Sequence, residues 1–535
     1  MLNTPWYKNP TLLKIMALAF FVLASCLVLN DRFNWFDDAY YIMLAKALAT
    51  GYGYYDINLP TPQLHKLFPP GLSILLAFPS WLNFDLKTTL IIFKLILIAC
   101  GTIGLYAFVH LAKQEGYKEP AITYAIIISA TSIAMVGHSS RVASEMLYIL
   151  LSILALICLN YYEKAPKISR YLFFSALLIV GCLLTRSVGV LLLPAIFISW
   201  IIRREFLKLA LLFSLVILLL SPWIILTKRT GAGGTSRYIS DMWVQYVNTD
   251  SSAKANPRKA ITNKLVENTG LIAGREIPRI TFSISASSFV LDNYWINLFS
   301  LPIRLAITLL TLIPILLQLW PRPRISTLYL IFYLALLLIW PWEPSRFLIP
   351  LIPFLMLSFF IGLESVIQWI INKTTLNPSL LPKAISAIVI SLVVSHLISN
   401  IRFIRTVWQS GDYTFEAAEF WQDTQSAYNW VNKNLAKNTI LGCIPALEAY
   451  CYLYTERKSI ALPTNPIFCQ QVTHIIFVDE KLVNHNKDGQ AVGDFQNLIK
   501  RAGSDDFLKL AYQNKTVKVF TIDQPRLKEL LDGHP

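Results

Sequence analysis

Long apolar runs constrain the fold of this chain more than any other feature. A helix needs roughly 17 to 25 mainly apolar residues to cross the hydrocarbon core of a bilayer. Runs near this length recur at residues 12–30, 88–112, 120–137, 146–162, 171–185, 188–202, 206–227, 299–319, 325–340, 347–371 and 378–400. Charged residues make up only 15% of the 535-residue chain, against about 25% in a typical soluble protein. The sequence therefore predicts a polytopic α-helical membrane protein with about eleven transmembrane helices.

A shorter apolar stretch, residues 71–82, follows Pro69 and Pro70 and contains Pro79. It is too short to cross a bilayer, so we expect a helix that lies at the membrane interface. The first apolar run, 12–30, lacks a small-residue cleavage site. We interpret it as a retained helix rather than a signal peptide.

The distribution of Lys and Arg predicts the orientation in the membrane. The net charge of +15 does not indicate a nucleic-acid partner, because much of it lies in short loops beside the apolar runs. With the N-terminus in the cytoplasm, the inner loops contain more Lys and Arg than the short outer loops, as the positive-inside rule requires. An odd number of spans then places the C-terminus outside. We expect a multi-pass protein of the plasma (inner) membrane with a periplasmic or extracytoplasmic C-terminal domain.

The composition divides the chain into two parts. Residues 1–400 predict a transmembrane domain, with a first outer loop at 31–87 and a long outer loop at 228–298. Residues 401–535 are more polar, and short apolar segments alternate there with helical patterns. The expected strands are 439–443, 459–462, 474–478 and 517–522, and the expected helices are 415–434, 446–454 and 494–501. This alternation predicts a small α/β domain on the outer face, which covers the membrane site or recognises a substrate.

An acidic pair, Asp37-Asp38, follows the first apolar run directly. Two adjacent carboxylates where a helix emerges into water suit a general base or a divalent cation. The alternative is structural: Asp37 caps the helix that follows, because its side-chain oxygen can accept from exposed backbone N–H groups.

Further charged residues fall in loops on the same predicted outer face. They are Lys66, Arg141, Glu145, Arg186 and Arg346. Charges near membrane depth are costly and usually functional, and arginines can hold a phosphate through paired N–H bonds. Structural alternatives remain open for four of them. Arg141 and Glu145 lie four residues apart and can pair on a helix, Arg346 can extend from a helix end to the interface, and Arg186 can cap a tight hairpin.

Carboxylates, basic residues and apolar helices together fit one reaction class. A carboxylate removes a proton from an acceptor hydroxyl, arginines bind a leaving phosphate, and the helices hold a polyprenyl tail. These are the parts needed to transfer a sugar from a polyprenyl-phosphate carrier. The glycine-rich segment 231–234 is no phosphate loop, since the strand, lysine and helix of that motif are missing. The rival reading is a transporter or ligase of lipid-linked oligosaccharide or polysaccharide.

Several motifs resemble the GT-C glycosyltransferases, in particular the family 39 branch that holds protein O-mannosyltransferases and lipid A aminoarabinose transferases. Asp37-Asp38-Ala39-Tyr40-Tyr41 resembles the acidic motif of the first loop, and Phe68-Pro69-Pro70-Gly71-Leu72 resembles a Pro-Pro segment that follows it. Ser140-Arg141-Val142-Ala143-Ser144-Glu145 is similar to the second acidic motif. The remaining motifs are Leu184-Thr185-Arg186-Ser187-Val188-Gly189, the arginine-plus-proline run from Arg346 to Pro353, and the C-terminal segment from Leu453 to Lys458.

This resemblance implies an inverting transferase with a polyprenyl-phosphate sugar donor and a glycolipid, polysaccharide or protein acceptor. Asp37 is then the base, with Asp38 as the alternative, and Glu145 orients the site. The residues expected to contact the donor phosphate are Lys66, Arg141, Arg186 and Arg346. The acidic pair is Asp-Asp where this branch usually has Asp-Glu, and Glu145 stands where several relatives have aspartate. A divalent cation (Mg or Mn) at Asp37, Asp38 and Glu145 therefore stays an open expectation, and no other cofactor is expected.

Overall fold

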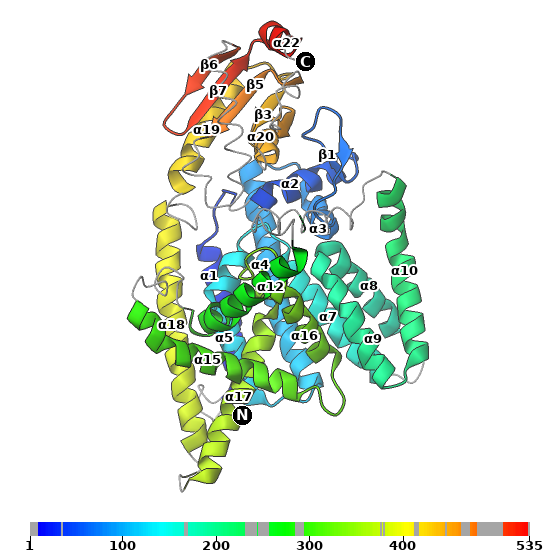
Figure 1. Cartoon of the computed structure of the whole chain (residues 1–535), viewed down its shortest axis with the longest axis vertical. Coiled ribbons are helices and arrows are strands. Elements are labelled where there is room, and N and C mark those ends of the chain that lie inside the picture. The colour runs from blue at the N-terminus through cyan, green and yellow to red at the C-terminus, as the bar shows by residue number, and fades with distance from the viewer. Residues whose placement is uncertain are drawn as a thin grey trace. The chain divides into compact units, whose positions relative to one another are not determined.

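The computed structural model describes residues 9–33, 36–164, 170–229, 243, 256–283, 294–374, 377, 380–410, 417–444, 447–461, 471–478 and 507–532. The chain divides into two compact units. Unit 1 comprises residues 1–29, 66–72 and 94–405, and unit 2 comprises residues 30–65, 73–93 and 406–535. Unit 1 is built of helices, whereas unit 2 joins the first loop to the C-terminal sheet (Figure 1). The domain boundary near residue 400 stays a prediction.

Apolar helices form unit 1, with one end of α4 and of α18 in unit 2. They are α1 (Pro10–Leu27), α4 (Leu86–Gln114), α5 (Glu119–Thr131), α6 (Ile133–Ser139), α7 (Glu145–Lys164), α8 (Arg170–Thr185), η2 (Ser187–Leu191), α9 (Leu192–Ile202), α10 (Phe206–Arg229), α15 (Tyr294–Leu317), α16 (Ile325–Leu338), η5 (Ile349–Leu351), α17 (Ile352–Lys373) and α18 (Leu380–Ser410). Each apolar run expected from the sequence overlaps one of these helices or a consecutive pair.

Length and composition support fewer spans than we expected. Among the described residues, seven helices are long and apolar enough to cross a membrane, or eight if α5 and α6, bent by 56°, form one span. The helices α8, α16 and the pair η2–α9 are apolar but shorter. The polytopic helical fold is therefore confirmed in kind, and the number of eleven spans stays a prediction.

The break between α5 and α6 is stabilised by polar side chains of α18. Ser132 adopts an extended conformation there, which interrupts the helical hydrogen bonds. Asn400 donates its Nδ2 hydrogen to the carbonyl oxygen of Thr131 at 2.7 Å, and His396 Nδ1 lies 3.2 Å from Thr131 Oγ1. A broken helix among apolar helices needs such partners, because a buried backbone group without a hydrogen bond costs several kcal/mol.

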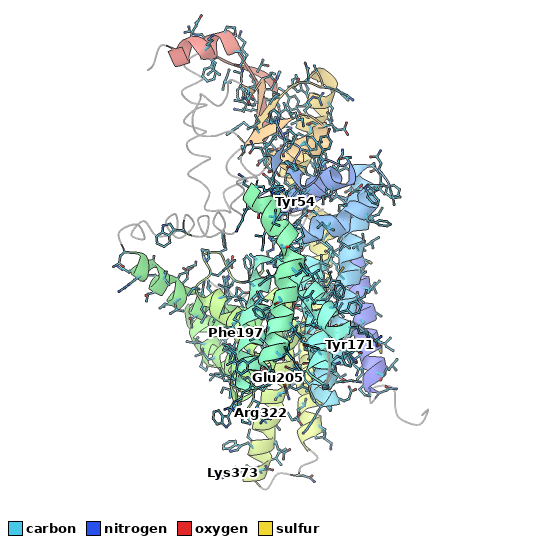
Figure 2. The ribbon with its side chains drawn as sticks, turned by 90° about the vertical axis from the view of Figure 1, so that its right-hand side faces the viewer. Tyr54, Tyr171, Phe197, Glu205, Arg322 and Lys373 are labelled. Carbon is cyan, nitrogen blue, oxygen red and sulfur yellow. The ribbon has the colours of Figure 1, made fainter. Side chains whose placement is uncertain are left out.

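The loops expected to face the cytoplasm lie toward one end of unit 1. Figure 2 shows Glu205, Arg322 and Lys373 toward that end, which the loops after α9, α15 and α17 form. The loops of this end therefore hold part of the basic charge that suggested the orientation. The side of the membrane on which they lie stays a prediction.

Part of the long loop is helical and belongs to unit 1. It forms α12 (Pro257–Leu271), the π-helix η4 (Ile272–Glu276) and α13 (Ile277–Phe282). Asn268 fixes α12 to the end of α16 by donating to the carbonyl oxygens of Leu337 and Trp340, at 3.0 and 2.8 Å. The sequence also predicts amphipathic helices at 242–247 and 261–266 of this loop. The second lies within α12, while the first falls largely outside the described residues.

A five-stranded sheet forms the C-terminal part of unit 2, in the order β4-β3-β5-β7-β6. The elements are α19 (Ala417–Asn434), β3 (Leu441–Cys443), α20 (Glu448–Thr455), β4 (Ser459–Ala461), β5 (His474–Val478), β6 (Leu508–Gln513), β7 (Val517–Ile522) and α22 (Gln524–Asp532). β3 pairs parallel with β4 and β5, while β7 pairs antiparallel with β5 and β6. The α/β class is confirmed. β6 was not expected, and the helix expected at 494–501 lies outside the described residues.

The first loop packs on the edge of this sheet. It contains α2 (Phe36–Ala49), the short strands β1 (Tyr55–Asp56) and β2 (Gln63–Leu64), and α3 (Gly71–Ser80). Ser459 N–H donates to the carbonyl oxygen of Asn58 at 2.8 Å, and Asn58 Nδ2 donates back to that of Ser459 at 3.2 Å. This reciprocal pair covers the edge strand β4, which would otherwise expose unpaired backbone groups.

Arg457 has a structural role in unit 2. The side chain is 3% exposed and donates to the carbonyl oxygens of Leu435, Ala436 and Thr455 at 2.6 to 3.0 Å, and to Asn432 Oδ1 at 2.5 Å. It thereby caps the end of α19 and ties it to α20, as a basic side chain near a helix C-terminus can. The segment 453–458, which carried part of the resemblance, thus has a packing explanation.

Arg457→Lys should destabilise the protein by about 2 kcal/mol or more, because a lysine lacks the fork that reaches these acceptors, and each buried polar group left without a partner costs about 1–3 kcal/mol. Thermal unfolding of the purified full chain in detergent measures the change. Arg526→Lys, at an exposed pair with Glu529, is the control and should stay within about 0.5 kcal/mol of the wild type. Equal effects of the two substitutions would contradict the structural role.

Candidate functional site

A buried carboxylate at the start of α7 joins two distant arginines. Glu145 is the first residue of α7 and has no exposed surface. Its Oε1 lies 2.6 Å from Arg186 Nη1 and 2.5 Å from Arg346 Nε. Arg186 follows the end of α8, and Arg346 lies between α16 and η5. Three segments that are remote in sequence therefore meet at one carboxylate oxygen.

The position of Arg186 depends on a tight turn between α8 and η2. Arg186 is extended, with φ −147° and ψ 137°, and η2 starts at the next residue. A Cβ atom at Gly189 would lie 2.7 Å from the carbonyl oxygen of Cys182, so only glycine fits this close approach. The hairpin expected from the sequence is present. Its arginine also donates to Ser144 Oγ at 3.0 Å and lies over the ring of Phe347 at 5.4 Å.

The cluster carries more positive than negative charge. His138, at the end of α6, is within electrostatic range of Arg141, Arg186, Arg346 and Glu145. Among the described residues of this cluster, three guanidinium groups then lie near one carboxylate, which is an excess of two positive charges when His138 is neutral. Burying charge is costly unless it is paired, and a buried ion pair is weak evidence for a stabilising role. An excess of positive charge on buried and half-buried side chains is instead suited to an anion.

The structural alternatives for Arg346 and Arg186 do not account for all the contacts that these two side chains make. Arg346 does not simply extend to a membrane interface, since its Nε pairs with Glu145 and its side chain is 17% exposed. Arg186 does more than cap its turn, because it reaches Glu145 as well. Lys66 is half-buried and belongs to the same unit, in the segment before α3. Its expected contact with a donor phosphate stays a prediction.

The acidic pair lies in the first turn of α2, in unit 2. Asp38 is fully buried, and Asp37 is half-buried. The side chain of Tyr450, from α20, is buried beside both: burial, Asp38 and Asp37 raise its pKa well above the usual range. Tyr40 donates to the Glu448 carboxylate, and burial together with Glu448, Asp56 and Asp37 raises the pKa of Tyr40. The acidic motif therefore has partners from the C-terminal residues of the same unit.

The expected cation site stays a prediction. Asp37 and Asp38 belong to unit 2, whereas Glu145 belongs to unit 1. Within the described ranges, no group of three or more His, Cys, Asp or Glu side chains is arranged to hold a metal ion. We therefore derive no step of a reaction through a metal.

Sequence reasoning missed several polar residues. Lys94 is fully buried in α4, and a lysine inside an apolar run is a signal that could have identified it. Glu448 and Tyr450 gave no such signal, because nothing local distinguishes them from other residues of a polar region. His396 and Asn400 lie in the apolar run of α18, where their polarity could have indicated a partner.

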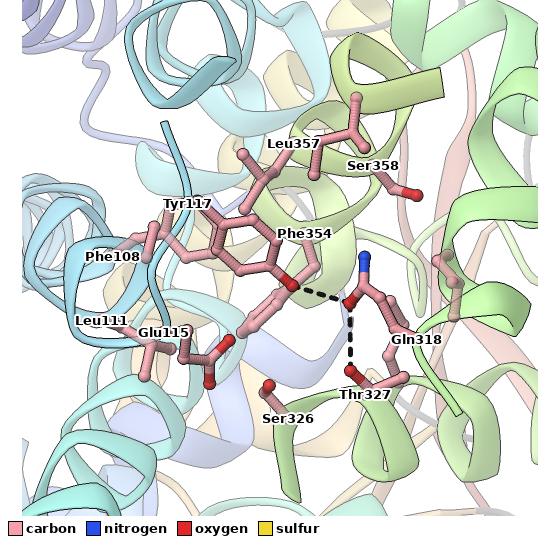
Figure 3. A pocket seen from close by; sticks show the side chains of 14 residues that line it. Phe108, Leu111, Glu115, Tyr117, Gln318, Ser326, Thr327, Phe354, Leu357 and Ser358 are labelled. Carbon is pink, nitrogen blue, oxygen red and sulfur yellow. Dashed lines mark hydrogen bonds between the residues drawn. The ribbon is translucent and has the colours of Figure 1, made fainter. Parts of the chain in front are cut away.

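A separate pocket lies where α4, α15, α16 and α17 come together (Figure 3). Tyr117 donates its hydroxyl hydrogen to Gln318 Oε1 at 2.7 Å, and Thr327 donates to the same oxygen at 3.2 Å. The apolar side chains of Phe108 and Phe354 complete this wall. None of the expected site residues lines the pocket.

Glu115 lines the same pocket, and its substitution tests how burial of its carboxyl group affects the stability of the fold. Desolvation raises its pKa, although Ser326 and Arg324 act in the opposite direction. A raised pKa means that the folded chain holds this proton to higher pH than the unfolded chain, so the carboxyl group favours folding below its ordinary pKa and loses this contribution as pH rises. Glu115→Gln should therefore raise the thermal midpoint at neutral pH, and the gain should vanish on acidification. A lowered midpoint at neutral pH would mean that the attraction to Arg324 outweighs desolvation.

No family model matches the chain, and no curated protein matches its sequence significantly. Solved structures match its fold. The archaeal oligosaccharyltransferase AglB from Archaeoglobus fulgidus, in complex with an inhibitory peptide and a dolichol-phosphate, is 11% identical, with 87% of this chain and 69% of that chain covered and a TM-score of 0.55. ArnT from Cupriavidus metallidurans bound to undecaprenyl phosphate is 10% identical, with 95% of this chain and 97% of that chain covered and a TM-score of 0.54. At such identities the likeness is one of fold.

Proposed function

We propose that this chain, which has the GT-C glycosyltransferase fold, is a membrane glycosyltransferase. It moves a sugar from a polyprenyl-phosphate donor to a glycolipid, polysaccharide or protein acceptor on the outer face of the membrane, with inversion at the sugar carbon. The protein lies in the plasma (inner) membrane, with its N-terminus in the cytoplasm and its C-terminal domain outside the cell or in the periplasm.

The buried cluster of Glu145, Arg186 and Arg346 carries this proposal. Its excess of positive charge, at the start of an apolar helix, fits a phosphate whose tail lies among apolar helices. The fold adds to this argument. One structural neighbour is bound to undecaprenyl phosphate and the other is in complex with a dolichol-phosphate and an inhibitory peptide, so both bind a polyprenyl phosphate.

The proposed reaction is a single displacement. The guanidinium groups of Arg141, Arg186 and Arg346, with the ammonium group of Lys66, bind the donor phosphate, and Glu145 holds two of the arginines in place. An acceptor hydroxyl attacks the anomeric carbon, and Asp37 takes its proton. The bond between that carbon and the phosphate oxygen breaks as the new glycosidic bond forms, and polyprenyl phosphate leaves with the bonding electrons.

Asp37→Asn tests the base. Turnover should fall by roughly 10²–10⁴, the range for proton transfer by a positioned side chain, while binding of undecaprenyl phosphate persists. Turnover is measured per folded molecule, with labelled undecaprenyl-phosphate mannose, glucose and aminoarabinose offered in turn to purified membranes. Asp38→Asn should cost less. If Asp37 only stabilises the start of α2, its loss costs about 1 kcal/mol of stability and leaves the turnover per folded molecule near normal. Near-normal turnover of both variants would therefore rule out the proposed base.

Arg186→Lys and Arg346→Lys test the phosphate contacts. Each keeps the charge and loses the planar fork. A hydrogen bond to a charged group is worth roughly 1.5–3 kcal/mol, so undecaprenyl phosphate should bind about tenfold more weakly or worse.

The matched control for these variants is Arg275→Lys. Arg275 also pairs with a buried carboxylate of unit 1, since its Nε lies 2.7 Å from Glu276 Oε1, but it lies in η4, outside the proposed site. Binding should be unchanged in this control. Unchanged binding in all three variants would make the cluster purely structural.

A further inference from the structure

Helix α20, in the C-terminal part of unit 2, packs against the acidic helix α2 of the same unit. The Tyr40 hydroxyl donates to the Glu448 carboxylate in this contact. A second, exposed contact joins α2 to the residue that caps the end of α20, because Lys46 Nζ lies 3.7 Å from Glu456 Oε1. The ring of Phe33, just before α2, stands edge-on to Tyr450 with centroids 4.6 Å apart. Two polar contacts and an aromatic contact therefore connect the acidic segment to α20.

The Tyr40–Glu448 contact joins a half-buried tyrosine to a buried carboxylate, and the burial of the carboxylate makes the contact informative. Glu448 is 8% exposed, and Tyr450, two residues further along α20, has no exposed surface. Removing a carboxylate from water costs free energy, which is recovered only through partners that bind the charge. Well-packed apolar side chains in the place of such a buried charged contact often give the same stability or more. Stability alone therefore does not account for a carboxylate at this place.

Glu448 lies on a helix, α20, whose two ends are both fixed by hydrogen bonds. Its carbonyl oxygen accepts a hydrogen bond from Ser459 Oγ at 2.6 Å, which ties the start of α20 to strand β4. At the other end of α20, Thr455 accepts from the Arg457 side chain, which also binds the end of α19. Because α20 is anchored at both ends, the Glu448 side chain that it carries can define the position of the neighbouring helix α2.

Helix geometry gives this contact a consequence for the acidic pair. Tyr40 lies three residues after Asp37, so the two side chains lie on the same face of α2. A bond that holds Tyr40 therefore sets the rotation of α2 and the direction of Asp37. Reacting groups must be placed closely, since a misplacement of about 1 Å can reduce the rate about 10²-fold.

We propose that Glu448 is a positioning residue for the acidic pair, acting through the Tyr40 hydroxyl. This inference rests on the proposed function, in which Asp37 is the base. The C-terminal domain then does more than cover a membrane site, because it supplies the acceptor that orients α2.

The test compares Tyr40→Phe, Glu448→Ala, their double variant and Glu448→Gln in the full chain. Tyr40→Phe and Glu448→Ala should each lower kcat for the labelled undecaprenyl-phosphate sugar that the wild type uses by roughly 10- to 10²-fold, with donor KM unchanged. The double variant should be no worse than either single variant, because one bond is lost in all three. Glu448→Gln should stay near the wild type, since its amide oxygen accepts the same bond.

Two further measurements separate positioning from a loss of folding. Amide hydrogen exchange of residues 37–42 should rise equally in Tyr40→Phe and Glu448→Ala, and should stay at the wild-type level in Glu448→Gln. This measurement does not depend on the identity of the sugar. Glu456→Gln removes the exposed contact between α2 and the residue that caps α20 and is the matched control, with kcat and exchange expected to be unchanged.

Each contrary result has one meaning. Normal kcat in Tyr40→Phe and Glu448→Ala, beside a large loss in Asp37→Asn, would overturn the positioning role and leave the proposed function intact. Normal kcat in Asp37→Asn would overturn the assignment of the base itself. Additive losses in the double variant, or a Glu448→Gln variant as slow as Glu448→Ala, would show that Glu448 does not act through the Tyr40 bond.

Discussion

The ion pairs of Glu145 with Arg186 and Arg346 impose the strongest physical constraint on unit 1. A carboxylate with no exposed surface among apolar helices is tolerated only with partners of opposite charge, and both arginines come from distant segments. The start of α7, the turn after α8 and the segment before η5 must therefore meet. The arrangement brings an excess of positive charge to one place, and the proposed phosphate contacts follow from this excess.

The same demand for partners explains other features of the fold. The break between α5 and α6 exposes backbone groups among apolar helices. Asn400 of α18 donates to the carbonyl oxygen of Thr131 there, and His396 of α18 contacts the Thr131 hydroxyl. In unit 2, the edge strand β4 is paired by the backbone carbonyl and the side-chain amide of Asn58, and the acidic helix α2 is held by the Glu448 carboxylate. Polar groups that look isolated in sequence thus connect segments that are far apart along the chain.

Much of the helical architecture was predictable because hydrophobicity along the chain is a local property. Each apolar run produced a helix or a consecutive pair, and the alternating C-terminal segments produced an α/β fold. Strand β6 escaped prediction because Leu508 to Gln513 are mostly exposed or half-buried and lack the regular alternation of a half-buried strand. The break at Ser132 also escaped, since it lies in a continuous apolar run that gives no local signal for a bend.

The sequence by itself determined the type of fold and the kinds of groups that the chain offers for chemistry. The paired carboxylates, the basic residues and the apolar runs all stand in the linear order of residues. Only the tertiary structure decided which groups meet. Arg141 is the nearest arginine to Glu145 in sequence, yet the closest pairs of Glu145 are with Arg186 and Arg346. Tyr40 and Glu448 are 408 residues apart and share a hydrogen bond. The reason is physical: a charged or polar side chain in an apolar interior takes the partner that its direction and packing bring within reach, and both depend on contacts between distant parts of the chain.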